Sequence, residues 1–408
     1  MSHTTIERNP PRAAVPPGTQ RLLGAPPELP LPHLSAQQLV DLVEEAGLTG
    51  RGGAGFPTAR KLRAVVGQDV VLVGNAMEGE PLSSKDAVLL DRAPGLVVDG
   101  LSLLAASLGA RRAVLATGPD VPAGPVTAAA RGTLVEVVAL TDGFVATGFV
   151  AGQESALVAR LDGRRGVPTD PLTPVRRRGI GGRPTLVLNA ETLAQLAVLA
   201  RHGAGWFRSQ GTPDDPGTFL ATVTGSAPGL VAAPGVLEAP RGTPLLSLLG
   251  RAGTALDRVG AVLVGGYHGA WIPARALDVL TTSSDLGRFG ASPGAGVVHA
   301  LDRDTCPLEV GSRIAAYLAR ESARQCGPCV NGLPRLARTL GELADPATAA
   351  GTVAEVERLR RLVDGRGACA HPAGTLRFVS STMTVFADHV EEHLGGECRA
   401  RARRLDQV

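Results

Sequence analysis

Short apolar runs of strand length alternate with longer amphipathic stretches over the first half of the chain. The strand-length runs are VVLVGNAM, RRAVLATG, VEVVAL and PTLVLN, and the helix-length stretches include LVDLVEEAG, PGLVVDGLSLLAASLG, QESALVARLDGRR and ETLAQLAVLARHG. Ser35 followed by Gln38 is the capping-box pattern that begins a helix, and Gly47 is suited to end that helix. Strands that alternate with helices predict a layered α/β domain.

The pattern changes twice in the second half. From about Pro216, short apolar runs such as TFLATVTGSA and GAVLVGG are broken by Gly and Pro, which predicts a small β-rich module ending near Gly294. From about Val310, apolar residues recur at helical spacing, which predicts a helical bundle. One face expected to be buried consists of Leu376, Val379, Met383, Phe386, Val390 and Leu394.

These changes divide the chain into five segments. Residues 1–33 form a polar, Pro-rich lead that we expect to be disordered, and residues 401–408 form a basic tail. Between them we expect an α/β domain over 34–215, a β-rich module over 216–298 and a helical domain over 299–400. A chain of 408 residues is long enough for two or three such units.

Composition and charge exclude several function classes. The net charge of +3 is too small to indicate a nucleic-acid partner, and 44% apolar with 19% charged residues is ordinary for a soluble globular protein. No stretch reaches the ~18 uninterrupted apolar residues of a membrane helix, so direct membrane insertion is not expected. The start carries no signal-peptide pattern. Five cysteines, an odd number, favour a reducing cytoplasm and metal chemistry over disulfides.

Three cysteines near the C-terminus carry the clearest candidate chemistry. Cys326 and Cys329 form a C-x-x-C in the run ESARQCGPCVNG, and Cys369 follows in GRGACAHPAG. Closely spaced thiolates are soft ligands suited to an iron–sulfur cluster or to zinc. A cluster would require an electron donor elsewhere in the chain.

A glycine loop is the candidate for a phosphate-binding element. Gly50, Gly52 and Gly55 satisfy G-x-G-x-x-G, but a dinucleotide fingerprint needs a strand before the loop and a helix after it. Here a helix precedes the loop and the clear strand comes later, so the standard Rossmann interpretation fails. Glycines still let backbone N–H groups approach a phosphate, and Arg51 and Lys61 can supply charge. The alternative is a surface loop without a ligand.

Five ordered motifs resemble one enzyme family. The runs are GLTGRGGAGFPTARK, GNAMEGEPLSSKDAVLL, GFVAGQESALVARLDGRRGVP, GRPTLVLNAETLA and ESARQCGPC. They are similar to the FMN-bearing NADH dehydrogenase subunit of respiratory complex I and to the corresponding subunits of NAD-linked hydrogenases and formate dehydrogenases. The resemblance implies a Rossmann-like α/β flavin domain, a small β-grasp-like module of the SLBB type and a C-terminal helical bundle that carries a 4Fe-4S cluster.

The resemblance also implies roles for individual residues. Positions that hold FMN in the family correspond here to Arg51, Gly52, Gly53, Lys61, Asn75, Glu78, Gly152, Glu154, Asn189 and Thr192. Positions that contact NADH correspond to Phe56, Glu80 and Phe149. NADH would be the substrate and hydride donor to FMN, and the cluster would accept electrons one at a time. No protein residue is needed as a catalytic acid or base.

Several residues depart from the family pattern. Met77 stands where the family has Asp, Gln153 replaces the first Glu of a pair, Leu188 replaces an Asn, and Ala64 replaces an aromatic residue. Most of these changes would remove a polar contact near the flavin or the nucleotide. Two functions therefore remain open: an NADH-oxidising flavoprotein subunit of the NADH dehydrogenase type, and a cluster-bearing electron-transfer or structural subunit with a degenerate flavin site.

The cluster motif departs as well. The family supplies four cysteines, and Ala323 stands at the first of these positions, which leaves Cys326, Cys329 and Cys369. His371 lies two residues after Cys369 and could replace the lost ligand. The alternatives are a solvent-exposed His371 with an open iron or a 3Fe-4S cluster, and a zinc site with the same ligands.

The remaining cysteines and histidines receive no ligand role from the sequence. Cys306 is expected to be a small buried residue, Cys398 a free thiol, and His393 has no partner pattern. Because the chain has one cysteine set, electrons must leave it for another polypeptide. The resemblance suggests a thioredoxin-like 2Fe-2S subunit or a ferredoxin as that partner, with the chain cytoplasmic or peripheral to a membrane complex.

Overall fold

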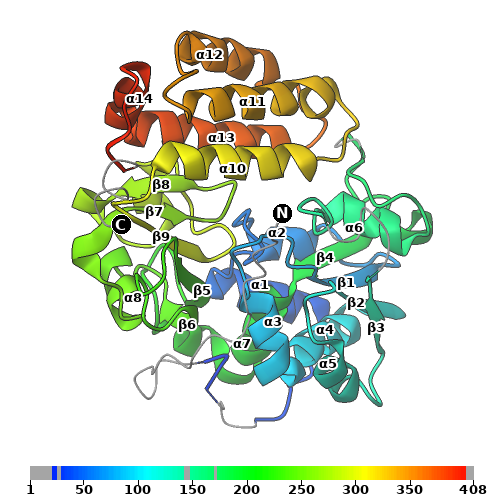
Figure 1. The fold of residues 1–408 in the computed structure, drawn as a ribbon. Helices are drawn as coiled ribbons and strands as arrows, with labels where there is room; N and C mark the ends of the chain where they lie inside the picture. Colours follow the sequence, from blue (N-terminus) through cyan, green and yellow to red (C-terminus); the bar gives the residue numbers. More distant parts are fainter. Residues whose placement is uncertain (1–20, 25–28, 142–147, 170–171, 401–408) are drawn as a thin grey trace.

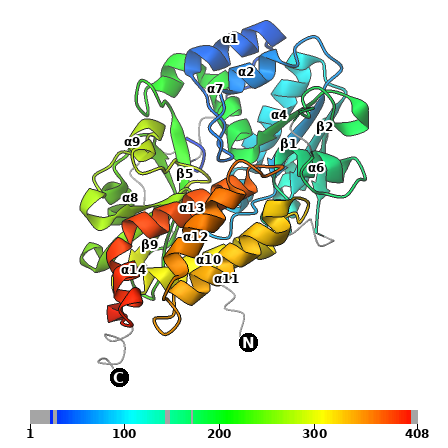
Figure 2. The ribbon, with the colours of Figure 1, turned by 90° about the horizontal axis from the view of Figure 1, so that it is seen from above.

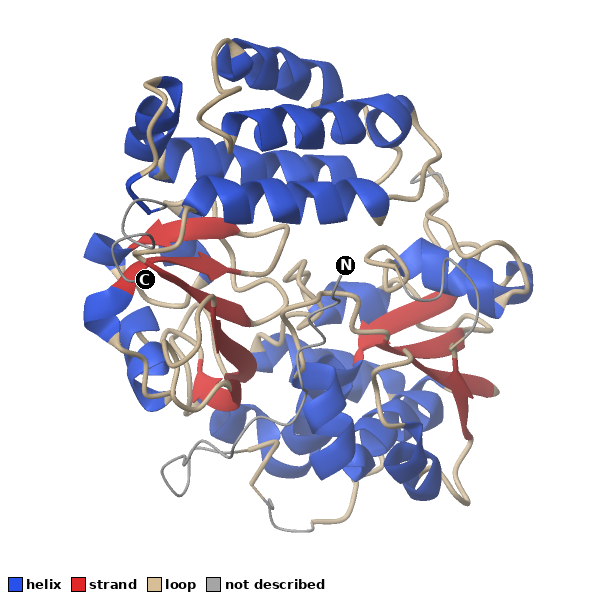
Figure 3. Ribbon diagram, in the orientation of Figure 1, coloured by secondary structure: helices blue, strands red, loops and turns tan. Residues whose placement is uncertain are grey.

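A computed structural model describes residues 21–24, 29–141, 148–169 and 172–400. Most of the expected lead and the whole basic tail lie outside these residues. Figure 1 shows two sheets beside each other, with a layer of helices across both. Figure 3 separates the same elements by type and shows that the helical layer comes from the C-terminal part of the chain. Among the described residues, no helix is both long and apolar enough to cross a membrane.

The first sheet is parallel and has the order β3-β2-β1-β4. Its strands are β1 (Val71–Ala76), β2 (Arg112–Thr117), β3 (Val135–Ala139) and β4 (Thr185–Asn189). Strands β1 and β4 are in register, with Asn75 opposite Asn189 at their carboxyl ends. In parallel α/β sheets, ligands bind beyond the carboxyl ends of the strands, so this pair marks the expected site edge.

Helices cover both faces of the first sheet. They are α1 (Ala36–Ala46), α2 (Thr58–Arg63), α3 (Lys85–Arg92), α4 (Pro94–Leu108), α5 (Ala123–Ala129), α6 (Glu154–Leu161) and α7 (Ala190–Arg208). Alternate residues of β1 serve the two faces, since Leu72 packs in the core with α4 and α7 whereas Val73 packs in the smaller core with α6. The predicted capping box of α1 is confirmed, with Ser35 and Gln38 bonded reciprocally and Gly47 in the left-handed conformation.

The second sheet is mixed and has the order β6-β5-β9-β7-β8. Its strands are β5 (Thr218–Gly225), β6 (Gly235–Pro240), β7 (Val259–Val264), β8 (Ala270–Pro273) and β9 (Val297–Asp302). Strands β5 and β9 are parallel and the other neighbouring pairs are antiparallel. The short helices α8 (Leu245–Arg251) and α9 (Ser283–Gly287) supply Leu248 and Leu286 to the apolar core beside this sheet.

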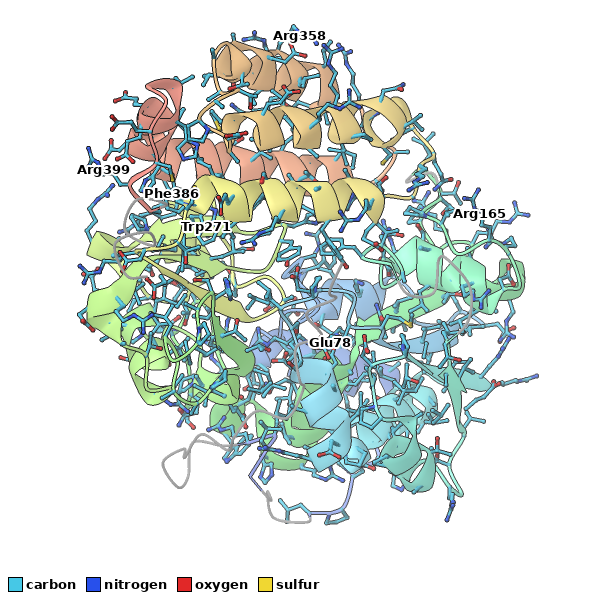
Figure 4. All side chains as sticks on the ribbon, in the orientation of Figure 1. Glu78, Arg165, Trp271, Arg358, Phe386 and Arg399 are labelled. Atoms are coloured by element: carbon cyan, nitrogen blue, oxygen red, sulfur yellow. The ribbon has the colours of Figure 1, made fainter. Side chains whose placement is uncertain are left out.

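The C-terminal bundle contains α10 (Pro307–Arg320), α11 (Leu333–Leu343), α12 (Thr352–Val363), α13 (His371–Val385) and α14 (Ala387–Leu394), with a π-helical turn at Pro328–Gly332 before α11. Figure 2 shows these helices lying over the rest of the molecule. Trp271 of β8 joins bundle and sheet, because its indole N–H donates to the Thr382 hydroxyl (3.1 Å). Figure 4 labels Trp271 beside Phe386 at this junction, where the ring centroids are 5.3 Å apart.

The apolar stripe predicted for the last helix is correct over most of its length. Leu376, Val379, Phe386 and Val390 are buried, but Leu394 is 44% exposed. The reason is a break at Phe386, which separates α13 from α14 and rotates the later residues relative to the earlier ones. The prediction of a buried Leu394 is therefore wrong.

Candidate flavin and iron–sulfur sites

The glycine loop lies between α1 and α2, against the start of α7. Gly53 and Gly55 have positive φ angles of 107° and 60°, which side-chain-bearing residues rarely adopt. A Cβ on Gly52 would lie 3.1 Å from the Cβ of Asn189, so the loop backbone packs tightly on the sheet edge. The Arg51 backbone N–H donates to the Thr192 hydroxyl (2.9 Å) and fixes the loop to α7. The loop is thus held with its backbone open to a cavity.

That cavity has a volume of about 540 Å³ and runs between the glycine loop and the second sheet. Its lining includes Gly50, Arg51, Gly53, Ala54, Gly55, Glu191, Phe219, Arg241, Gly294 and Arg377. A concave pocket of this size, with glycine backbone on one wall, is suited to a mononucleotide.

Arg51 gives this cavity a positive wall. Its guanidinium is buried and donates to the Thr49 hydroxyl (2.9 Å) and the Pro216 carbonyl (3.1 Å), while its Nε has no partner among the described residues. Burial, with the charge of Arg241 next, lowers the pKa of Arg51 to about 10. An arginine with an unused buried donor beside a glycine loop fits a bound anion such as the FMN phosphate.

The sheet edge carries two asparagines in complementary roles. The Asn75 amide donates to the Gly152 carbonyl (2.8 Å) and its oxygen accepts from the Met77 backbone N–H (3.1 Å). Asn189 caps α7 by accepting from the Glu191 backbone N–H (3.0 Å). Both amides are therefore fixed in orientation next to the glycine loop.

A buried ion network lies behind these asparagines. Lys85 Nζ is 2.7 Å from Asp86 Oδ1 and 3.1 Å from Glu191 Oε2, and the three side chains are 4%, 4% and 2% exposed. Lys85 also donates to Asn189 Oδ1 (3.1 Å), and Glu191 accepts from the Leu220 backbone N–H of β5 (3.0 Å). Burial alone would lower the pKa of Lys85, but the Asp86 and Glu191 carboxylates outweigh it and raise the pKa. The network holds the site edge and joins the two sheets.

Lys61 approaches the same edge from α2. Its ammonium is 3.2 Å from Glu154 Oε1 at the start of α6 and donates to the Val187 carbonyl of β4 (3.1 Å). Gln153 accepts from the Ala156 backbone N–H (2.9 Å) and so caps α6. Lys61 and Glu154, predicted as flavin residues from segments 93 positions apart, are thus direct neighbours.

Glu78 and Glu80 follow β1 on a turn between the two sheets, where Figure 4 labels Glu78. Glu78 has an unusual φ of 27° and accepts from the Ser83 hydroxyl (2.7 Å) and from the Asp86 and Ala87 backbone N–H groups (3.0 and 2.9 Å). Burial, and then the Asp86 charge, raises the pKa of Glu78. Glu78 therefore serves as a cap for α3 at the edge of the site.

Glu80 reaches across to the second sheet. Its carboxylate accepts from the Tyr267 backbone N–H (2.8 Å), and burial raises the pKa of Glu80 to about 8 against the lowering effect of the Tyr267 and Leu82 N–H groups. A Cβ on Gly266 would lie 2.3 Å from Glu80 Oε2, so only glycine fits there. The carboxyl is held in place for a hydrogen bond to a ligand.

The two aromatic residues predicted to contact NADH occupy different surroundings. Phe56 is 41% exposed on the glycine loop, with the Arg60 guanidinium 5.3 Å from its ring centroid. Phe149 lies under the bundle, with ring centroids 4.5 Å from His268 and 6.3 Å from Tyr317. No ring contact in the described part of the chain joins Phe56 to Phe149, so only Phe56 is free to stack on a ligand from its present position.

Two departures from the family pattern are accommodated inside the fold. Leu188 is 4% exposed and packs in the apolar core shared by α4 and α7, so the expected loss of a polar contact there is wrong. Met77 is 5% exposed, and a Cβ on Gly152 would lie 3.4 Å from its Cβ, which places it at the flavin edge. Met77 is therefore the substitution most able to alter the site.

The three candidate cluster cysteines converge from two loops. The Ala368 and Cys329 backbone N–H groups approach the Cys326 thiol, and the Ser322 hydroxyl approaches the Cys329 thiol. Burial, followed by the nearby Cys326 and Cys369 thiols, raises the pKa of Cys329 to about 12. Three thiols amid hydrogen-bond donors fit a cluster held by three cysteines, because N–H groups stabilise cluster sulfur. Ala323, the missing fourth position, is buried next to them and offers no ligand atom.

His371 begins α13 and is buried, at 3% exposure, so the alternative that it is solvent-exposed is wrong. One ring nitrogen, Nε2, is 2.9 Å from the Leu318 carbonyl and must carry a proton to bond to it. The other, Nδ1, is buried without a partner in the described structure. The ring packs 5.0 Å from His268 and 5.6 Å from Phe149, and the contact with Cys369 is made by the His371 backbone N–H.

The cluster loop rests on the flavin domain. Gln325 donates to the Pro168 carbonyl (2.9 Å), and a Cβ on Gly148 would lie 3.0 Å from Glu321 Oε2. Ser322 and Ala323 line a small cleft together with Val150. The segment that carries the first two cysteines is therefore close to the chain just before α6, as a short electron path requires.

Sequence reasoning missed several residues of the site. Lys85 and Asp86 had a visible signal, because a Lys-Asp pair directly follows the GNAMEGEP motif and charged residues are rarely buried without a role. Arg241 and Arg377 had none, since they reach the cavity from other parts of the chain.

Two family models match the chain, and two curated relatives resemble it over most of its length. Residues 43–198 match the Nuo51 FMN-binding domain, and residues 309–393 match the NADH-ubiquinone oxidoreductase-F iron–sulfur binding region. The second of the F-type NADH-quinone oxidoreductase subunits of Rhizobium meliloti is 30% identical over 392 residues, covering 89% of this chain and 91% of that protein. The HndC subunit of the NADP-reducing hydrogenase of Solidesulfovibrio fructosivorans is 29% identical over 385 residues, covering 88% and 77%.

A solved structure shares the fold. The NAD+-reducing NiFe hydrogenase in its air-oxidized state superposes with a TM-score of 0.79 at 30% identity, over 88% of this chain and 63% of that chain. This protein thus spans less than two thirds of the hydrogenase chain that it matches. Its family matches cover both the flavin edge and the three-cysteine loops described above. The chain belongs to the family of F-type NADH-quinone oxidoreductase subunits, with an FMN-binding domain and a 4Fe-4S-binding region.

Proposed function

We propose that this chain is an electron-transfer flavoprotein subunit that oxidises NADH through FMN and passes electrons to an iron–sulfur cluster. The observation that carries the proposal is the buried Arg51, whose Nε lacks a partner among the described residues, beside a glycine loop that opens onto a cavity of about 540 Å³. A buried guanidinium donor without a partner is costly unless an anion satisfies it. The FMN phosphate supplies that anion.

The residues of the sheet edge would hold the flavin in one orientation. Arg51, Gly52 and Gly53 would approach the phosphate, and the fixed amides of Asn75 and Asn189 would face the polar part of FMN. The remaining positions proposed from the family are Lys61, Glu78, Gly152, Glu154 and Thr192. Bound FMN supplies hydride acceptance and release of single electrons, and the protein supplies placement and electrostatics.

NADH would approach from the exposed side of the glycine loop. Phe56 is free to stack on the nucleotide, and Glu80 is fixed by the Tyr267 N–H to accept or donate a hydrogen bond. Phe149 would contribute as a wall under the bundle, where it already packs on His268. Because Met77 replaces a polar residue at this edge, we expect NADH to reduce the flavin more weakly than in relatives that carry the full motif.

For the cluster we propose Cys326, Cys329 and Cys369 as ligands and His371 as the candidate fourth, through Nδ1. Support comes from Nδ1, which has no partner in the described structure, while Nε2 bonds to Leu318. The competing account is three-cysteine ligation with an open iron or a 3Fe-4S cluster. His371→Ala should lose iron or shift the EPR signal of the reduced cluster, and an unchanged spectrum would favour the competing account.

A degenerate flavin site is the second candidate function, and buried Met77 beside Gly152 is the observation in its favour. In that case the chain would keep its cluster and serve as an electron-transfer or structural subunit. The two functions differ in a simple property, because only the first requires tight FMN binding.

The proposal extends to the organisation and surroundings of the chain. We assign an α/β flavin domain to 34–215, an SLBB-type β-grasp-like module to 216–298 and the cluster domain to 299–400. The mixed sheet packed with α8 supports the SLBB assignment. We further propose a thioredoxin-like 2Fe-2S subunit or a ferredoxin as electron acceptor, and a cytoplasmic location either free or bound to a membrane complex, since all five cysteines are free.

FMN binding to purified protein tests the enzyme proposal. We expect wild type to quench the fluorescence of FMN at one equivalent, and Lys61→Ala to bind at least about tenfold more weakly, because a charge-assisted hydrogen bond contributes about 1.5–3 kcal/mol. The matched control is Arg63→Ala on the same helix, since Arg63 is exposed and pairs with Glu44 away from the cavity. Absence of FMN binding by wild type would reject the enzyme proposal and leave the electron-transfer subunit.

A further inference from the structure

A second group of thiols is built from residues outside the cluster loops. Cys306, His393 and Cys398 are buried, and their ligand atoms all lie within 4.8 Å of one another. The exposed fractions of the three residues are 1%, 0% and 9%. They come from three places in the sequence: the turn after β9, the last turn of α14, and the segment that follows α14. The folding of the bundle alone brings them together.

The hydrogen bond of His393 fixes which ring nitrogen is free. Nδ1 is 2.9 Å from the Leu343 carbonyl at the end of α11. A carbonyl only accepts, so Nδ1 carries the proton and the neutral ring presents its lone pair at Nε2. That Nε2 lies 3.5 Å from Cys306 Sγ. Histidines that bind metals characteristically donate their other ring N–H to a carbonyl or carboxylate in this way.

The surroundings of Cys306 favour a thiolate. Cys306 is the residue before the first turn of α10, a helix of 14 residues, and the backbone N–H groups of Leu308 and Glu309 approach its sulfur. Exposed N–H groups at a helix start stabilise negative charge. Cys398 lies within hydrogen-bonding distance of the same sulfur. Two thiols and one imidazole lone pair thus face one point.

The spacing fits a single tetrahedral ion. With Zn–S bonds of about 2.3 Å and a Zn–N bond of about 2.0–2.1 Å, tetrahedral geometry places sulfur and nitrogen about 3.5–3.6 Å apart and two sulfurs about 3.8 Å apart. The distance of 3.5 Å between Cys306 Sγ and His393 Nε2 agrees with the first value. The limit of 4.8 Å for the whole group is compatible with the second.

We propose that Cys306, His393 and Cys398 bind one Zn²⁺ ion, separate from the iron–sulfur cluster. Binding forms two Zn–S bonds and one Zn–N bond and releases two protons, one from each thiol, while His393 keeps its proton on Nδ1. Water completes the fourth position. Thiolate and imidazole ligands suit zinc, and the cluster cysteines form a set of their own on other loops of the bundle.

The ion would fasten the C-terminal end of the bundle. Cys306 joins the second sheet to α10, His393 is bonded to the end of α11, and Cys398 lies in the chain after α14. Zinc would therefore connect three segments of the bundle through direct bonds in addition to side-chain packing. The proposal does not depend on FMN, NADH or the cluster.

The test measures zinc and iron in the same purified protein, grown with both metals. We expect about one zinc per chain in wild type, and in Cys398→Ser and His393→Gln a loss of affinity greater than the roughly 10–100-fold that follows removal of a mere partner of a metal-bound histidine. Iron should stay at the wild-type level in both variants. Cys326→Ser should do the reverse, losing iron and keeping zinc.

His389→Gln is the matched control, because His389 lies one turn earlier on α14 and packs on Phe386 with ring centroids 6.1 Å apart. It should retain wild-type zinc. If a ligand variant fails to fold, wild type alone decides: alkylation of Cys306 and Cys398, read by peptide mass, should be slow until a zinc chelator is added.

Three results would overturn the proposal. One is zinc content that none of the ligand variants changes. Another is loss of iron, in place of zinc, from Cys398→Ser. The third is a Cys306–Cys398 disulfide in protein purified without reductant and with zinc present, because a disulfide consumes both thiolate ligands.

Discussion

Lys85 offers the sharpest test of how the flavin edge is held together. Its ammonium is buried between Asp86 and Glu191 at 2.7 and 3.1 Å, and no side chain of the three is more than 4% exposed. The perturbation is Lys85→Met, which keeps the length of the side chain and removes its charge. Two carboxylates would then be buried without their cation, each left with one hydrogen bond, from Asn189 and from the Leu220 N–H respectively.

The size of the effect follows from the contacts. At 2.7 Å and an effective dielectric constant of about 20, two unit charges attract by about 6 kcal/mol. Desolvation of the three groups offsets most of that attraction in the wild type, but removing one partner leaves the penalty without the gain. Breaking a buried ion pair in this way costs about 3–5 kcal/mol. We expect Lys85→Met to lose that much free energy of unfolding at neutral pH.

The pH dependence of the loss has a definite sign. The raised pKa of Lys85 means that its contribution is fully present at neutral pH and is lost only as the pH rises through that pKa. In the variant the unpaired carboxylates can be neutralised by protons, so its deficit should shrink as the pH falls. Lys85→Met combined with Glu191→Gln should recover part of the loss, because one buried charge is removed.

Urea unfolding followed by circular dichroism measures these differences, and Arg112→Met provides the control. Arg112 pairs with Glu136 at 3.8 Å, with side chains 43% and 57% exposed, so its loss should cost about 0.5 kcal/mol or less. A Lys85→Met deficit as small as that of Arg112→Met would refute the reasoning, because the network would then add nothing beyond a surface pair.

Three further predictions concern other parts of the molecule. The raised pKa of Glu80, about 8, means that the folded state binds its proton more tightly than the unfolded state, so stability falls as pH rises toward 8; Glu80→Gln should show a smaller fall between about pH 5 and about pH 9 in urea unfolding. Trp271→Ala should lose about 3–5 kcal/mol by the same measurement, because the side chain is fully buried and bonds to Thr382. Ala323→Cys restores the fourth cluster cysteine, and it should raise bound iron to four per chain with a 4Fe-4S EPR signal; iron and EPR identical to wild type would contradict this.

The first sheet could be predicted from sequence because its signals are local. Each of its strands is an apolar run bounded by Gly, Pro or Asn, and α1 carries a complete capping box. Helix α3 was not predicted because it begins with Lys85 and Asp86, which are buried by pairing with each other and with Glu191. The loop expected before α7 is absent because Asn189 ends β4 and caps the helix at once.

The flavin site could be predicted only where family motifs mark it. Asn75, Lys61 and Glu154 were found in that way, and Lys61 and Glu154 are direct neighbours in the structure. Arg241 could not be found, because its place in the cavity depends on a bidentate pair with Asp215 that forms only after the second sheet folds (2.9 and 2.6 Å). A similar limit hid the zinc candidate, since 87 residues separate Cys306 from His393 and no short motif links them.

The two metal-ligand groups of the bundle show why loss of a ligand has different meanings in different places. Ala323 stands where the family has a cysteine, yet the loop around it is still fixed to the flavin domain by Gln325 and Pro168. The electron path therefore keeps its geometry while the cluster loses a ligand. A neutral replacement such as water or imidazole leaves the cluster less negative than a fourth thiolate would, and such a change raises its reduction potential. The cluster of this chain should accept electrons from the flavin more readily than a four-cysteine cluster in the same position, and deliver them to its partner with a smaller driving force.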